Sequence, residues 1–280
     1  VAEKPSDLKK GSWRLDRGAN RVAHDRMHEA LTTFHSSEAD SGTVLRDVLL
    51  GALHDISASA QRPPEIRGQK QHGPLGIGKM QLNSSQESAI EAALAQRLTL
   101  IQGPPGTGKT HTAIRLLTAF VRMGRGPILA TAESNVAVDN LLEGLLEMNV
   151  KAVRIGRPVK VREHLREATL DARIEQHPMQ EELRFIREQN DELRRNLTGL
   201  KGKEKGLAHR DVNRNFKEIR QIEGNMISAV LDEAEVICAT TIGVGHNLLG
   251  DRKFPVVLMD EATQASEPSA LVPITRGCRQ

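Results

Sequence analysis

Short apolar runs alternate with longer stretches of helical periodicity over most of the chain after residue 80. Helices are predicted where apolar residues recur every three to four positions, at 20–34, 43–53, 84–96, 110–121 and 136–148. Strands are predicted at 98–101, 127–132, 151–155, 236–239 and 255–259. This alternation is typical of a parallel sheet covered by helices on both faces, so the pattern predicts an α/β fold. Ser84 and Glu87 have the spacing of a capping box, which predicts where the helix at 84–96 begins.

The alternation is interrupted by a highly charged segment at about 162–231. Its apolar residues form two stripes with the three- and four-residue spacing of a coiled-coil seam. The first stripe is Leu183, Ile186, Asn190, Leu193, Leu197 and Leu200, and the second is Val212, Phe216, Ile219, Met226 and Val230. Glycines at 199, 202 and 206 break the first stripe, so we predict an antiparallel helical hairpin inserted into the α/β fold. The alternative is a solvated pair of charged helices that only stiffens the fold.

Glycine and proline are concentrated in residues 61–78, which predicts a linker or long loop there. The linker separates an N-terminal part, 1–60, from a domain at 79–280 that contains the alternating elements and the inserted hairpin. Because the chain begins with Val1 and stops just after an apolar run, we expect it to be a piece of a longer protein.

Composition narrows the class of protein. Lys and Arg total 39 against 36 for Asp and Glu, and a net charge of +3 excludes a histone-like polycation. No apolar run approaches the roughly 18 residues that span a bilayer, and no signal peptide is recognisable. We therefore expect no membrane partner and a cytoplasmic and/or nuclear location. Two cysteines exclude a disulfide framework, and a single Trp, five Phe and no Tyr argue against base stacking on aromatic residues.

A glycine-rich segment follows the predicted strand at 98–101. Residues 103–110 read Gly-Pro-Pro-Gly-Thr-Gly-Lys-Thr, which fits the phosphate-binding pattern of Gly, four residues, Gly, Lys and Ser or Thr. Glycines let backbone N–H groups turn inward around a polyphosphate, and the next helix adds its positive N-terminal end. Lys109 is predicted to reach the β- and γ-phosphates, and Thr110 to offer its hydroxyl to Mg²⁺. The predicted cradle comprises Gly103, Gly106, Thr107, Gly108, Lys109 and Thr110.

A second motif closes the apolar strand at 255–259. Asp260 and Glu261 follow that strand directly, and an acidic pair at this place gains weight from the phosphate loop in the same chain. Asp260 is predicted to hold the Mg²⁺ together with Thr110. Glu261 is predicted to polarise the attacking water as a general base.

Four segments, in this order and spacing, resemble the Q motif and motifs I, Ia and II of superfamily 1 helicases. They are Leu-Asn-Ser-Ser-Gln at 82–86, the glycine loop at 103–110, Ala-Glu-Ser-Asn-Val-Ala-Val-Asp at 132–139 and Asp-Glu-Ala-Thr-Gln at 260–264. The resemblance is to the nonsense-mediated-decay and immunoglobulin-mu-binding-protein type, to which residues 154–158 and 170–172 are also similar. It implies a RecA-like ATP-binding domain and movement from 5′ to 3′ along single-stranded RNA or DNA.

The resemblance also implies roles for individual residues. Gln86 would hydrogen-bond adenine, and Gln264 would sense the γ-phosphate and act in catalysis with Lys109 and Glu261. The sugar–phosphate backbone of a single nucleic-acid strand would be contacted by Ser134, Asn135, Thr240 and Thr241. Glu133 stands where the family usually has Pro, which places a negative charge beside the expected phosphate path. The hairpin matches a family insertion that packs near that path.

The same resemblance implies that parts of the motor lie outside this chain. Residues 1–60 would be a remnant of an accessory domain with stalk helices, and the domain at 79–280 would be incomplete at its C-terminal end. A second RecA-like domain would supply arginine fingers, so this segment alone is expected to bind Mg-ATP weakly and turn over poorly. The strand at 98–101 would then be an exposed apolar edge that favours aggregation.

Two other function classes stay open at this point. One is a P-loop kinase or signalling NTPase, which has no need for Ser134, Asn135 or Gln264. The other is an interaction module whose hairpin binds a partner while the nucleotide only supports the fold. Substituting Glu261 would separate the second class from an ATPase, because only an ATPase would lose turnover.

Overall fold

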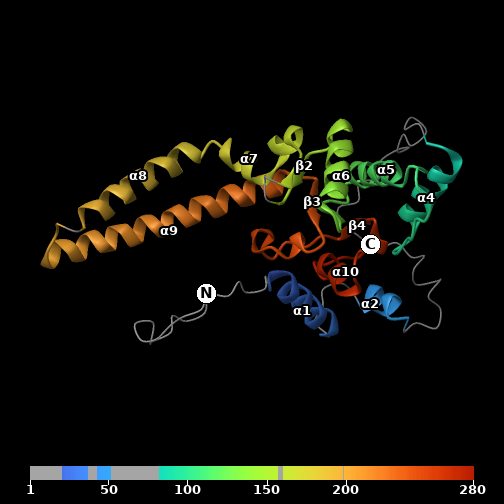
Figure 1. Cartoon of the computed structure of the whole chain (residues 1–280), viewed down its shortest axis with the longest axis horizontal. Helices are drawn as coiled ribbons and strands as arrows, with labels where there is room; N and C mark the ends of the chain where they lie inside the picture. Colours follow the sequence, from blue (N-terminus) through green and yellow to red (C-terminus); the bar gives the residue numbers. More distant parts are fainter. Residues whose placement is uncertain (1–20, 37–42, 52–81, 157–159, 198) are drawn as a thin grey trace, which may run out of the picture.

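Four parallel strands form the centre of the computed structural model, which describes residues 21–36, 43–51, 82–156, 160–197 and 199–280. The strands are β1 (Ile128–Ala132), β2 (Ala152–Arg154), β3 (Val236–Thr240) and β4 (Val256–Asp260), in the sheet order β2-β3-β1-β4. In register, Ile128 of β1 lies opposite Val236 on one side and Val256 on the other. The prediction of an α/β fold with a parallel sheet is confirmed (Figure 1).

One face of the sheet is covered by α5 (Lys109–Arg122) and α6 (Asn135–Glu147), and α4 (Ser84–Ala95) packs against α5 in the same core. Alternate residues of the strands point toward them, because successive side chains of a strand face opposite sides. In β1, Ile128, Ala130 and Ala132 pack into this core. The phosphate-binding pattern ends in the first turn of α5, and Ser134 and Asn135 form the N-terminal end of α6, so the core fixes both segments.

The opposite face carries a second core, which is built around the remaining strand positions such as Leu129 and Ile237. Its helices are α1 (Val22–His35), α7 (Leu170–Glu175), α10 (Glu267–Ile274) and the C-terminal end of α9 (Gly202–Glu233). Short elements complete the described chain: α2 (Thr43–Leu49) and the 3₁₀ helices η3 (Glu163–Ala168), η4 (Gly243–Gly245), η5 (Asn247–Leu249) and η6 (Ala262–Gln264). Within the described residues, no helix is both long and apolar enough to cross a membrane.

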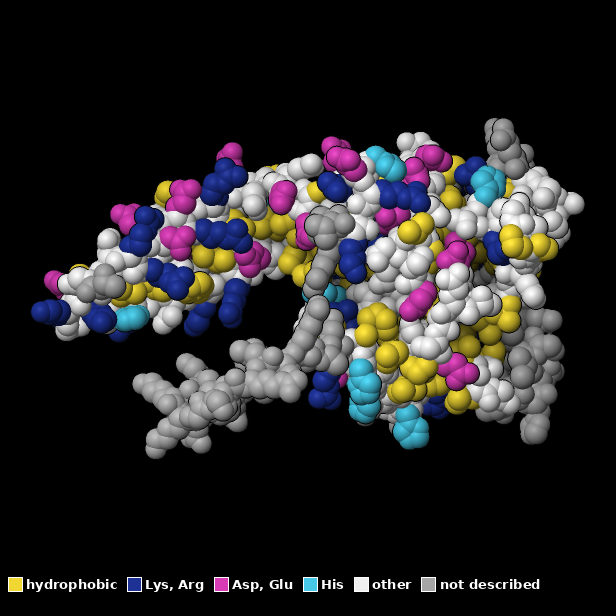
Figure 2. All heavy atoms as spheres, in the orientation of Figure 1, with side chains coloured by type: hydrophobic (Ala, Val, Ile, Leu, Met, Phe, Trp, Pro, Cys, Tyr) yellow, Lys and Arg dark blue, Asp and Glu magenta, His cyan; other side chains and the backbone are white. Residues whose placement is uncertain are grey.

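The predicted helical hairpin is formed by α8 (Gln180–Asn196) and α9, and it projects away from the sheet at the left of Figure 1. It has a small core of its own, made of Leu183, Ile186, Ile219, Ile222 and Met226. Charged side chains of both signs cover its outside (Figure 2). Of the three glycines that interrupt the first stripe, the one at 206 lies inside α9, which begins at Gly202. A glycine inside a helix costs only about 1 kcal/mol relative to alanine, and packing along the seam offsets that cost.

Two local predictions are corrected by the structure. Residues 98–101 form no strand, and Leu100 is 86% exposed. A strand needs the backbone of a neighbour, and the N–H of Val257 on the outer edge of β4 is instead bonded to the carbonyl of Gln280. The helix α4 is capped by Asn83 with Gln86, one residue before the expected Ser84 and Glu87. The predicted linker at 61–78 lies outside the described residues.

Candidate functional site

The glycine-rich loop adopts backbone conformations that only glycine reaches without strain. Gly106 has φ = 80° and Gly108 has φ = 79°, both in the left-handed region. A Cβ atom on Gly103 would lie 2.8 Å from Oγ1 of Thr107, so this position is also closed to larger residues by contact. The loop ends at the first turn of α5, whose N-cap is Gly108 and has no side-chain cap. Its N-terminal N–H groups and positive dipole end are therefore available to an anion.

Lys109 folds back over the loop. Its Nζ donates to the carbonyl oxygens of Gly103 at 2.8 Å and Pro104 at 3.0 Å. No carboxylate of the described residues lies within ion-pair distance of this ammonium group, so its charge is left for an anionic ligand. Burial, and secondly the charge of Arg115, lower the pKa of the nearby His111, which keeps that imidazole neutral at pH 7.

Thr110 and Asp260 come together from opposite sides of the site. Oγ1 of Thr110 donates to Oδ2 of Asp260 at 2.8 Å, although the two residues are 150 positions apart in the chain. A hydroxyl and a carboxylate oxygen in contact are hard ligands of the kind that Mg²⁺ prefers. The described residues contain no group of three or more His, Cys, Asp or Glu side chains that could enclose a metal ion. This sparse pair fits an ion that keeps most of its water ligands and is bound largely through phosphate oxygens.

Glu261 directly follows this pair and has an unusual backbone. Its φ is 53°, a left-handed value that costs a non-glycine residue roughly 1–2 kcal/mol. The N–H of Glu261 donates to Oδ1 of Asp260 at 3.0 Å, which helps to hold the turn. Its side chain is exposed, as is that of Gln264, whose N–H donates to the Glu261 carbonyl at 2.9 Å. Strain of this kind concentrates at functional sites, where it fixes the direction of a side chain.

Gln86 lies against the glycine loop. Its Nε2 donates to the Thr107 carbonyl at 3.2 Å, and its Oε1 accepts from the backbone N–H of Asn83 at 3.1 Å. A Cβ atom on Gly108 would lie 2.8 Å from this Nε2. The structure therefore brings Gln86 to the rim of the cradle, as the assignment of an adenine contact requires.

Sequence reasoning missed what fixes the helix that carries Gln86. Nε2 of Gln280 donates to two carbonyls at the C-terminal end of α4, those of Ala93 and Gln96, each at 2.7 Å. Its Oε1 accepts from Nη1 of the buried Arg125 at 2.7 Å. The last carbonyls of a helix have no partner inside the helix, so Gln280 satisfies them and joins α4 to the edge of β4. No motif marked this glutamine.

The four predicted nucleic-acid contacts gather at the carboxyl edge of the sheet. The register places Ala132, at the end of β1, beside Thr240 and Asp260, so the segments that leave these strands lie close together. Ser134 is the N-cap of α6, and its Oγ accepts from the Ala137 N–H at 3.1 Å. Asn135 is the first residue of that helix. Oγ1 of Thr240 accepts from the Gly243 N–H at 3.1 Å.

Thr241 differs from the other three residues because it is fully buried. Its hydroxyl donates to Oε2 of Glu133, and that same carboxylate oxygen accepts from Oγ of Ser269 at 2.9 Å. The Thr241 side chain is therefore not accessible to a nucleic-acid strand in this structure, contrary to the predicted contact. Glu133 joins the ends of β1 and β3 to α10, so its carboxylate is engaged with hydroxyl donors rather than left beside the phosphate path. The hydroxyl partner on α10 could not be found from sequence spacing.

The AAA domain family matches residues 81–280 of the sequence. This chain belongs to that family. The match covers the described sheet, the glycine loop, the hairpin and the acidic pair that follows β4, so all the site residues above lie within the AAA domain.

Three similar proteins are named as helicases or as DNA-binding. The ATP-dependent helicase NAM7 of Saccharomyces cerevisiae is 36% identical over 92% of this chain and 24% of its own length. An uncharacterized ATP-dependent helicase of Methanocaldococcus jannaschii is 31% identical over 98% of this chain and 45% of its own length. The DNA-binding protein SMUBP-2 of Mus musculus is 32% identical over 96% of this chain and 26% of its own length. This homology confirms the resemblance to superfamily 1 helicases, and the chain spans 24% to 45% of the length of these relatives.

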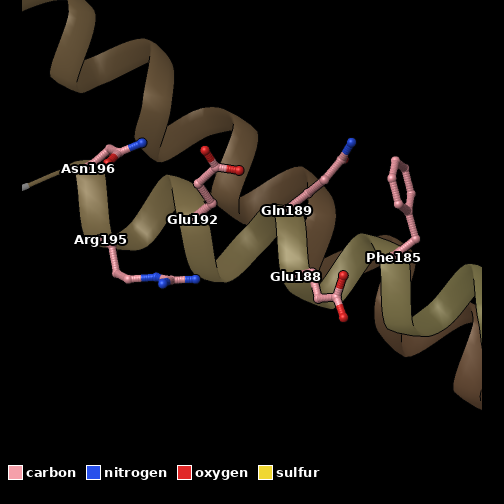
Figure 3. A pocket seen from close by; sticks show the side chains of 6 residues that line it. All are labelled: Phe185, Glu188, Gln189, Glu192, Arg195 and Asn196. Carbon is pink, nitrogen blue, oxygen red and sulfur yellow. The ribbon is translucent and has the colours of Figure 1, made fainter.

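One hollow on the AAA domain lies away from the glycine loop, along α8. Its six lining residues, Phe185, Glu188, Gln189, Glu192, Arg195 and Asn196, all project from α8 (Figure 3). All six side chains are exposed, and they mix both signs of charge with one aromatic ring. Nothing in this hollow resembles the converging polar groups of a substrate site.

Proposed function

We propose that this chain is the ATP-binding motor domain of a nucleic-acid-dependent ATPase and helicase that acts on single-stranded RNA or DNA. The observation that carries the proposal is the contact between Thr110 and Asp260 at the mouth of the glycine loop. This contact joins two residues from distant parts of the sequence that would form the two halves of a magnesium–triphosphate site. The printed names of the relatives, ATP-dependent helicases and a DNA-binding protein, support the same class of activity.

Each residue of the nucleotide site has a defined part in hydrolysis. Thr110 and Asp260 would hold Mg²⁺, which when bound neutralises charge on the phosphate oxygens. Lys109 exchanges its carbonyl partners for phosphate oxygens and stabilises the charge that develops during transfer. Glu261 accepts a proton from the attacking water, whose oxygen bonds to the γ-phosphorus as the bond to the β–γ bridging oxygen breaks. Gln86 binds the adenine edge, and Gln264 senses the γ-phosphate beside Glu261.

The nucleic-acid contacts lie on the same sheet edge as the nucleotide site. Ser134, Asn135 and Thr240 offer hydroxyl and amide groups that suit the sugar–phosphate backbone rather than base edges. Affinity should therefore depend little on sequence and fall as salt rises. Ala132 of β1 is in register with Thr240 on one side and Asp260 on the other, so only β1 separates the acidic pair from Thr240, and a change at that pair can be passed to the proposed nucleic-acid contacts across the sheet.

Turnover by this segment alone is expected to be slow. The resemblance implies that a second RecA-like domain supplies arginine fingers, and such a finger is worth on the order of 10³–10⁵ in rate. The exposed side chains of Glu261 and Gln264 support a site that is completed from another side. The location we propose for the protein is cytoplasmic and/or nuclear.

The proposal is tested with substitutions at Glu261 and Lys109. Glu261→Gln should lower ATP turnover by about 10²–10⁴-fold while leaving ATP affinity unchanged, since it removes only the proton acceptor. The matched control is Glu267→Gln, which alters an exposed carboxylate on α10 outside the site and should leave both quantities unchanged. Lys109→Ala should weaken binding of labelled ATP.

Turnover is measured on the full-length protein, with and without single-stranded RNA and DNA. Undiminished ATP uptake by the Lys109→Ala variant would refute the phosphate cradle. If neither RNA nor DNA stimulates hydrolysis, the result would instead favour an NTPase of another class.

A further inference from the structure

A fully buried ion pair lies behind the nucleic-acid contacts. Arg154 at the end of β2 is 1% exposed and Asp139 on α6 is 2% exposed, with 3.1 Å between Nε of the arginine and Oδ1 of the aspartate. Buried charges are costly unless every group is paired and hydrogen-bonded. The other carboxylate oxygen, Oδ2 of Asp139, accepts from the Arg162 backbone N–H at 3.2 Å.

The guanidinium group makes two more bonds beyond this pair. Nη1 of Arg154 donates to the carbonyl of Ile155, and Nη2 donates to the side-chain oxygen of Asn135 at 2.9 Å. Arg154 therefore spans the interior from Asp139 to the first residue of α6. Its planar fork reaches these partners at once, which a lysine ammonium on a flexible stem cannot do.

The bond from Arg154 fixes which way the Asn135 amide faces. Arginine has no acceptor atom, so the amide atom that faces it must be the oxygen. The Nδ2 group of Asn135 then points away from the arginine, and no described residue accepts a hydrogen bond from it. Next to it, Ser134 Oγ already accepts from the Ala137 N–H, which leaves the serine proton available to another acceptor. Both side chains thus present donors to a ligand.

We propose that Arg154 is a positioning residue that orients Asn135 as a hydrogen-bond donor, so that this edge of the sheet selects phosphate oxygens of a nucleic-acid backbone. The inference deepens the proposed function and rests on it. A side-chain amide that could turn freely would meet a phosphate with its oxygen part of the time, and two acceptors repel. Holding the oxygen on a buried arginine removes that orientation, and the buried Asp139 in turn keeps Arg154 in place.

A double-mutant cycle tests the inference on the full 280-residue chain. Binding of labelled 20-nucleotide poly(U) and poly(dT) is measured by fluorescence anisotropy for the unchanged chain, Arg154→Lys, Asn135→Ala and the double variant. ATP affinity and the unfolding midpoint are measured in parallel, because both report on the fold outside this contact. Asn135→Ala should weaken strand binding about 10-fold, and Arg154→Lys about 3- to 10-fold, with ATP affinity retained.

The decisive quantity is the effect of the arginine substitution once Asn135 is absent. If Arg154 acts through Asn135, Arg154→Lys costs nothing further in the Asn135→Ala background. A cost that is equal in both backgrounds, or no cost in the unchanged background, would overturn the inference alone. An unchanged chain that binds ATP but neither RNA nor DNA would overturn this inference, whereas the proposed function fails only if neither nucleic acid stimulates turnover of the full-length protein.

Gly156→Ala provides a second variant if Arg154→Lys proves unstable. A Cβ atom on Gly156 would lie 3.0 Å from Nη1 of Arg154 and 3.5 Å from its Cζ, so it displaces the guanidinium without removing its charge. We expect a loss of strand affinity that disappears in the Asn135→Ala background. An equal loss in both backgrounds would contradict the positioning role.

Discussion

Two glycines in the phosphate loop allow the adenine contact to be tested separately from the loop conformation. Gly106 and Gly108 have almost the same φ, 80° and 79°, so alanine at either position costs about 1–2 kcal/mol of backbone strain. Their surroundings differ. A Cβ atom on Gly106 has nothing within 4 Å, whereas one on Gly108 would lie 2.8 Å from Nε2 of Gln86.

Gly108→Ala should therefore displace the Gln86 amide, and Gly106→Ala should not. The displaced side chain loses its 3.2 Å bond to the Thr107 carbonyl and, under the proposed function, its bond to adenine. A neutral hydrogen bond contributes about 0.5–1.5 kcal/mol, which is roughly 2- to 12-fold in affinity. We expect the ratio of ATP to GTP affinity to fall by this factor in Gly108→Ala and to stay unchanged in Gly106→Ala.

The assay is a titration of both variants with fluorescently labelled ATP and GTP in the presence of Mg²⁺. The ratio is the informative quantity, because any general damage to the cradle weakens both nucleotides alike. Gln86→Ala serves as the reference for complete loss of the contact. The reasoning is refuted if the two glycine variants keep the same ratio, or if both lose it equally.

Four further outcomes are expected. Glu261→Gly should raise the free energy of unfolding by roughly 0.5 kcal/mol in urea titrations, because it relieves a left-handed backbone at the cost of a more flexible unfolded chain. The same variant should abolish ATP turnover. Asn149→Gly, at φ = 56° but outside the site, should leave turnover intact. Burial raises the pKa of the Cys238 and Cys278 thiols to about 12, so neither should react with a thiol reagent at pH 8 in the folded chain. Since the unfolded thiols release their protons near their ordinary pKa of 9.0, unfolding titrations at pH 8 and pH 10 should show stability falling as pH rises from about 9 toward 12. Leu100→Ser should reduce aggregation of the 280-residue chain in light scattering, because Leu100 is 86% exposed, and an unchanged aggregation rate would place the adhesive surface elsewhere.

The arrangement of the candidate nucleotide site could be predicted from the sequence because the residues that compose it are grouped in short motifs. A phosphate loop needs its glycines, lysine and threonine in consecutive positions, and an acidic pair at a strand end is visible in the sequence. Thr110 and Asp260 meet as expected because α5, which carries Thr110, packs against β4, which ends at Asp260.

The predictions that the structure corrects concern residues whose conformation depends on partners that are distant in the sequence. The apolar run at 98–101 has the composition of a strand, but a strand forms only where a neighbouring backbone accepts it, and spacing contains no such information. The orientation of Thr241 and Glu133 could not be predicted for the same reason. Either side chain could face a ligand or the interior, and both face the interior because they hydrogen-bond the hydroxyl of Ser269 on α10. Arg154 and Asp139 were visible as charges within apolar elements, and that mismatch is the signal that could have marked them.

The 32 residues of α9 are one continuous helix, about 48 Å long at 1.5 Å per residue. Its last turns are packed under the sheet through Leu231, while its first turns lie out in solvent beside α8. A rod held only at one end amplifies whatever happens at its base, and a tilt of about 5° there would carry the far tip by about 4 Å. A small shift of the strands on nucleotide binding would thus move the far end of the α8–α9 hairpin, and any molecule bound there, by a larger distance.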